Sequence, residues 1–191
     1  MQAPNASSSN FFSYQAGYQA TDASNSNFFG VNAGRLSTNA NNSNFLGSGA
    51  GDASPGANNS NFLGQNAGNG ATNSNNSNFI GLSAGNGATN AGSSNFIGNN
   101  AGNGATTASL SNFIGFQAGQ NSTGNNVNAF GASAGFGNTL SGMTIFSNAS
   151  MPTYADFTAA SAAITVGLGA TANCTYLYHD QATNSIGAVR L

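Results

Sequence analysis

The chain has 191 residues, of which only 3% are charged, and its formal net charge is −2. That charged fraction is far below the roughly 25% typical of soluble globular domains, and Lys and Glu are absent. Without clustered Lys or Arg the chain lacks the surface that nucleic acid binding requires and the polybasic segment that binds anionic membranes. Since no run of about 20 apolar residues predicts a membrane-spanning helix, we expect no nucleic acid partner and no membrane insertion.

Residues 1–8 form a short lead-in. They begin Met1-Gln2-Ala3-Pro4 and lack the basic start and apolar core of a secretion signal, so no signal peptide is expected. Cys174 is the only cysteine, which excludes an intramolecular disulfide.

Residues 9–142 are dominated by one phrase, Ser-Asn-Phe-aliphatic-Gly, followed three residues later by Ala-Gly. Its serine recurs at a constant interval, each position being the previous one plus 17, at Ser9, Ser26, Ser43, Ser60, Ser77, Ser94 and Ser111. In an eighth copy, around Phe130, the interval from Ala118-Gly119 to Ala134-Gly135 is shorter by one. A fixed period of this length predicts an all-β, repetitive parallel β-roll or β-solenoid of about eight coils.

Each copy begins with a short strand, since Asn-Phe-Ile-Gly is rich in β-favouring residues and is bounded by Gly and Asn. Neighbouring side chains in a strand point to opposite faces, so Phe96 and Ile97 cannot both fill one coil. One of them packs inside, and the other forms an apolar stripe that we expect a second subunit to bury. These core and subunit-interface ladders comprise Phe11, Phe12, Phe28, Phe29, Phe45, Leu46, Phe62, Leu63, Phe79, Ile80, Phe96, Ile97, Phe113, Ile114 and Phe130.

The other half of each copy is the Ala-Gly step, as in Ala101-Gly102. Small residues allow close backbone approach, and the Asn and Gly around them accept the left-handed dihedral angles of tight corners. We therefore predict two short strands and two corners per coil, with coils about 4.8 Å apart. Stacked asparagines should form an amide ladder at Asn10, Asn27, Asn44, Asn61, Asn78, Asn95 and Asn112.

The phrase Phe-Ile-Gly-x-x-Ala-Gly resembles the head repeat of trimeric autotransporter adhesins. It is still more similar to the Asn-Phe-Ile-Gly-x-x-Ala-Gly repeats of predicted tail-fibre proteins of bacteriophages and related particles. The resemblance covers residues 9–142, and it implies a left-handed β-roll assembled as an intertwined or side-by-side homotrimer. The adhesin repeat is usually shorter than the repeat of this chain, which implies longer corners here.

Residues 143–191 lose the period and are predicted to be a C-terminal neck with a small β cap. Residues 143–146 are compatible with a last strand, and the Ala-rich residues 154–163 with a short helix or irregular neck. Residues 164–168, 175–179 and 186–191 alternate as strands do. Solenoids need atypical terminal units to prevent end-to-end aggregation, and this segment is suited to that role.

The titratable residues do not predict catalysis, a metal or a cofactor. A glycosidase needs paired carboxylates, but there is no Glu and the four Asp are scattered. A Ser-His-Asp site would depend on His179, whose neighbour Asp180 points the opposite way in a strand. Calcium-binding β-rolls need an Asp in every repeat, whereas only Asp22 and Asp52 lie in the repeats. His179 and Cys174 are expected to be an ordinary surface histidine and a buried free thiol.

These observations predict a structural protein that is not an enzyme. The preferred hypothesis is a phage or phage-like tail fibre or fibre tip, located in a virion tail or extracellular fibre. It would form a trimeric rod and present a surface to a host glycan or protein. The alternatives are the head of a bacterial trimeric surface adhesin and a self-polymerising extracellular filament.

A further alternative is an ice-binding solenoid, because flat threonine ladders order water. Thr72, Thr89 and Thr106 align at the interval of the repeat. In other copies Asp22, Ala57 and Gly124 fall near the equivalent place, so the ladder is expected to be short, which disfavours this function.

Overall fold

The computed structural model describes residues 5–146, 175–180 and 185–190. The chain divides into two units, Met1–Thr153 and Tyr154–Leu191, each of which is described by itself. Every regular element in the described ranges is a β-strand. Within the same ranges no helix is long and apolar enough to cross a membrane.

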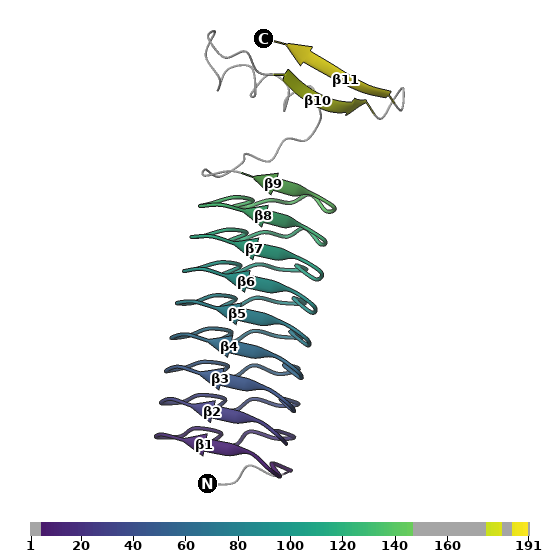
Figure 1. The fold of residues 1–191 in the computed structure, drawn as a ribbon. Coiled ribbons are helices and arrows are strands. Elements are labelled where there is room, and N and C mark those ends of the chain that lie inside the picture. The colour runs from purple at the N-terminus through teal and green to yellow at the C-terminus, as the bar shows by residue number, and fades with distance from the viewer. Residues whose placement is uncertain (1–4, 147–174, 181–184, 191) are drawn as a thin grey trace. The chain divides into compact units, whose positions relative to one another are not determined.

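The first unit is a parallel β-solenoid in which each coil contributes one three-residue strand to a single nine-stranded sheet (Figure 1). Each strand pairs in parallel with its equivalent in the next coil, for example Phe79 with Phe96 and Ile80 with Ile97. This register confirms the predicted all-β solenoid with 17-residue coils. The strands are β1 (Asn10–Phe12), β2 (Asn27–Phe29), β3 (Asn44–Leu46), β4 (Asn61–Leu63), β5 (Asn78–Ile80), β6 (Asn95–Ile97), β7 (Asn112–Ile114), β8 (Asn128–Phe130) and β9 (Thr144–Phe146).

The sheet continues past residue 142, where the roll was expected to end, and the last strand that residues 143–146 suggested is present as β9. Strand β9 pairs in parallel with β8, joining Ala129 to Ile145 and Phe130 to Phe146. The Ser-Asn-Phe phrase is lost in this coil, but Thr144 and Ile145 are β-branched and still favour a strand. The alternation of inward and outward side chains is therefore sufficient to extend the sheet without the full motif.

The rest of each coil consists mainly of turns, so the prediction of two strands per coil is only half correct. A second ladder is present as single-residue bridges, between Thr21 and Thr38 and between Thr72, Thr89 and Thr106. Between these points the backbone turns repeatedly through positive φ. In one representative coil the residues with positive φ are Gly81, Ser83, Gly85, Gly87, Asn90 and Ser93. Gly, and to a lesser degree Asn, tolerate this region, which accounts for the unusual composition.

A column of phenylalanine rings fills the solenoid. The middle residue of β2 to β7 is a fully buried Phe, and consecutive rings from Phe28 to Phe113 stack with centroids 4.7–4.8 Å apart. Buried alanines such as Ala84 and Ala88 line the remaining core. Gly85 lies against the face of the Phe79 ring, with no room for a Cβ atom. The core therefore needs a large flat residue opposite very small ones.

The serine before each strand satisfies buried backbone groups. Ser94 Oγ donates to the carbonyl of Ala108 at 2.7 Å and accepts from the backbone N–H of Ser111 at 3.0 Å. Equivalent pairs of bonds recur at Ser26, Ser43, Ser60 and Ser77. Since an unpaired buried N–H is costly, this serine ladder lets the chain enter each strand without a polar penalty.

The second unit contains an antiparallel hairpin of β10 (Thr175–Asp180) and β11 (Ser185–Arg190). These two strands match the last two that the sequence predicts. The predicted helix or neck at 154–163, the predicted strand at 164–168 and Cys174 lie outside the described residues. His179 pairs with Ile186 in this hairpin.

Candidate interaction faces of the solenoid

The first and third residues of each strand face outward, on the side opposite the buried phenylalanine. The third residues form a continuous stripe, called here the outer apolar ladder: Phe12, Phe29, Leu46, Leu63, Ile80, Ile97, Ile114, Phe130 and Phe146. Ile97 is 37% exposed while its neighbour Phe96 is fully buried. The two side chains thus lie on opposite faces, as the strand geometry predicted. Phe12 and Phe146, at the two ends of the ladder, are the most exposed, at 71% and 77%.

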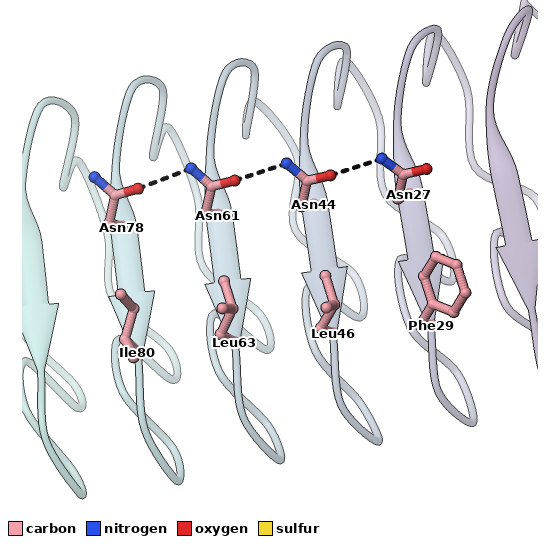
Figure 2. A pocket seen from close by; sticks show the side chains of 8 residues that line it. All are labelled: Asn27, Phe29, Asn44, Leu46, Asn61, Leu63, Asn78 and Ile80. Carbon is pink, nitrogen blue, oxygen red and sulfur yellow. Dashed lines mark hydrogen bonds between the residues drawn. The ribbon is translucent and has the colours of Figure 1, made fainter.

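The first residues of the strands form the amide ladder. Asn27 Nδ2 donates to Asn44 Oδ1 at 2.8 Å, and the same bond runs on through Asn61 and Asn78 (Figure 2). The ladder starts at Asn10 and reaches Asn128, one coil beyond the predicted asparagines. Each amide keeps one N–H and part of its carbonyl for other partners.

The two ladders run side by side and enclose a groove of about 520 Å³ along β2 to β5. Figure 2 shows Phe29, Leu46, Leu63 and Ile80 in one row and the asparagines in the other. No charged or nucleophilic side chain lines this groove. The groove therefore offers apolar contact flanked by neutral amides.

The sequence grouped the ladder residues without assigning a face to each, and the structure separates them. Phe28, Phe45, Phe62, Phe79, Phe96 and Phe113 form the core, and Phe11 packs against it. Phe130 belongs to the outer apolar ladder because Ala129 occupies the core position of β8. Ile145 fills the core in β9, and Phe146 stacks on Phe130 at 5.2 Å. The sequence reasoning missed these last two members, although their 16-residue spacing from Ala129 and Phe130 was visible.

The expectation of a short threonine ladder is wrong, because the equivalent places hold Thr21, Pro55 and Thr123 and not their neighbours Asp22, Ala57 and Gly124. Thr21 bridges Thr38, so Thr21, not Asp22, occupies the equivalent place. The hydrogen bonds from Thr106 N to Ser122 O and from Thr123 N to Asn138 O continue the column through Thr123 to Thr139. Pro55 is the one interruption, since Asn73 N donates to its carbonyl as Asn90 N does to Thr72 O. Thr123 follows Thr106 by the full 17 residues, and Thr139 follows Thr123 by 16.

Ionisable groups are few in the solenoid. Arg35 and Asp52, on adjacent coils, form a two-bond ion pair, Nε to Oδ1 at 3.1 Å and Nη2 to Oδ2 at 2.8 Å. The hydrogen bond and charge of Asp52 raise the pKa of Arg35. Asp22 accepts a hydrogen bond from Asn5 Nδ2 at 2.8 Å. Across the part of the chain that the structure describes, no three His, Cys, Asp or Glu residues gather as metal ligands would.

Comparisons of this chain with protein-family models, curated proteins and solved structures give no match.

Proposed function

We propose that the protein is a structural rod that works as a side-by-side homotrimer, as a segment of a phage or phage-like tail fibre. The observation that carries the proposal is the outer apolar ladder, which runs along all nine strands of the solenoid. A continuous apolar stripe of this size on a protein surface commonly marks a site of interaction.

The area of the ladder supports an interface. A large aromatic side chain carries about 150–250 Å², and at the observed exposures the nine side chains present on the order of 600 Å² per copy. That equals the largest apolar patch of an ordinary monomer, about 300–600 Å². With the amide ladder at its edge, the face approaches the roughly 800 Å² per partner of a stable interface.

A threefold arrangement suits a ladder that is one residue wide. Three such ridges converge on an axis, while the asparagines stay at the rim, where water satisfies their remaining N–H groups. In this proposal the roll is left-handed, as the resemblance to adhesin heads and tail fibres implies. The C-terminal unit serves as a cap that presents a surface to a host glycan or protein.

The test is the solution mass of the purified chain and of two variants. A homotrimer has three times the 18.9 kDa of one chain by light scattering. Ile97→Asp places a charge in the proposed interface and should yield a folded single chain, because an unpaired buried charge is not tolerated. Asn99→Asp adds the same charge at an exposed site two residues further on and should remain trimeric.

A wild-type mass near that of one chain would refute the trimer. A trimer that Ile97→Asp leaves intact would place the interface elsewhere. The adhesin head remains the alternative within the same architecture, and a self-polymerising filament would appear in electron microscopy as rods of indefinite length.

A second candidate, binding to ice, is favoured by the corrected threonine ladder. Seven of its eight places hold Thr, and within residues 5–146 none of these hydroxyls hydrogen-bonds to a protein group. Hydroxyls at the coil spacing, 4.7–4.8 Å between stacked rings, lie close to the spacing of water oxygens in the surface rows of ice. Thermal hysteresis that Thr89→Arg abolishes and Asn99→Arg preserves would establish this function, and its absence in the wild type would dismiss it.

A further inference from the structure

Three Asn-Gly dipeptides stack at the same place in consecutive coils: Asn69-Gly70, Asn86-Gly87 and Asn103-Gly104. Asn followed by Gly is the dipeptide most prone to spontaneous deamidation. The reaction begins when the backbone nitrogen of the second residue attacks the side-chain carbonyl of the asparagine, and glycine has no side chain to hinder the approach. In an unfolded chain all three dipeptides are therefore prone to deamidation.

In the folded solenoid the three attacking nitrogens are engaged elsewhere. The N–H groups of Gly70, Gly87 and Gly104 donate to the carbonyls of Asp52, Asn69 and Asn86 in the preceding coil, each at 2.8 Å. The glycines are fixed at φ of +64 to +66°, and the asparagine side chains are half-buried. Attack requires the inter-coil hydrogen bond to break and the peptide to turn, so the coils must first separate locally.

We infer that this column is a modification site that opens only when the coils come apart. The glycine nitrogen forms a bond to Cγ of the asparagine, its proton is lost to solvent, and the side-chain nitrogen leaves as ammonia to give a cyclic imide. One water molecule then opens the ring, and the product is aspartate or isoaspartate. The balance is one water taken up and one ammonia released, with no oxidant or reductant.

The isoaspartate product is incompatible with the solenoid, whereas Asp52 shows that a single aspartate is accepted at this place when Arg35 pairs with it. Isoaspartate adds a backbone carbon at a place where hydrogen bonds join one coil to the next, such as Gly87 N to Asn69 O and Gly104 N to Asn86 O. Deamidation of all three asparagines also stacks three carboxylates at the coil spacing of 4.7–4.8 Å, where like charges repel. A rod that has been open long enough therefore cannot close again, and unfolding becomes irreversible by chemistry rather than by aggregation.

The experiment compares the full chain folded in buffer with the full chain held unfolded in guanidinium chloride at the same mildly alkaline pH. Peptide mass mapping measures deamidation at the three asparagines over time. We expect the folded rod to react at least about tenfold more slowly at every one of them, since only the open fraction reacts. Equal rates in the two states would overturn the inference.

Gly87→Asn is the matched control. Nothing lies within 4 Å of a Cβ atom at Gly87, and Asn121 holds the equivalent place with φ of +57°, so the variant should fold. In the unfolded chain it should slow deamidation at Asn86 alone. Wild-type protein that has been aged in the unfolded state should refold in lower yield than freshly unfolded protein. The same ageing should reduce the refolding yield of Gly87→Asn by a smaller amount. An aged wild type that refolds fully would overturn the link to irreversibility. This test is independent of the oligomeric state.

Discussion

The inner and outer columns of the sheet come from adjacent residues, yet they follow different rules. The inner column is Phe in every strand from β2 to β7, whereas the outer apolar ladder changes from Phe to Leu to Ile and back to Phe. From β2 to β7 the closed core holds one residue type, because each stacked ring fills the same space between its neighbours. The outer face requires only an apolar side chain. In these coils, a residue type that stays the same marks an enclosed position, and a residue type that varies marks an exposed one.

The largest effect that would test this contrast is truncation of the inner column. Phe96→Ala removes a ring stacked at 4.7–4.8 Å on both sides and leaves a closed cavity, so unfolding free energy should fall by about 3–5 kcal/mol. Ile97→Ala, on the 37% exposed side, should cost much less within one chain. Chemical denaturation of both variants under conditions that keep the oligomer constant measures the difference. Similar losses would mean that the outer ladder is enclosed as tightly as the core.

Glycine substitutions should show the same contrast between closed and open places. Gly98 has φ of +136°, and an added Cβ would meet the carbonyl of Gly115 in the next coil. Gly98→Ala should therefore cost more than about 3 kcal/mol, from backbone strain and the clash together.

The matched control is Gly87→Ala, where φ is +64° and a Cβ meets open space. Ala53 holds the equivalent place with φ of +52°, so the cost should stay within the about 1–2 kcal/mol of a left-handed alanine. The melting temperatures of Gly98→Ala and Gly87→Ala, compared with the wild type, show which substitution destabilises the protein more. A small loss of stability in Gly98→Ala would show that neighbouring coils can move apart to accommodate the added Cβ atom.

A smaller effect is expected in the serine ladder. Ser77→Ala removes the acceptor of the Ser94 backbone N–H at 3.1 Å and the donor to the Ala91 carbonyl at 2.7 Å. Both groups are buried, so the loss should be about 1–3 kcal/mol. Ser48→Ala, at an exposed corner, is the control and should change stability less. Equal effects would show that water reaches the ladder.

The sequence predicted the fold well where the motif was strictly periodic. From Ser9 to Ile114 the regular spacing placed every strand, its parallel pairing and the amide ladder. It failed where the coils shorten. Two successive coils of 16 residues, Asn112 to Asn128 and Asn128 to Thr144, shifted the counting, and this shift hid Thr139, Ile145 and Phe146 from the ladders to which they belong.

Alternation along a strand, visible in any Phe-Ile pair of this chain, was enough to say that one side chain is buried and the other exposed. The sequence could not say which, since both are apolar and both recur in every copy. The tertiary structure decided it through the glycine of the Ala-Gly step: Gly102 lies against the ring of Phe96 with no room for a Cβ, so the flat ring fits inside and the aliphatic side chain remains outside.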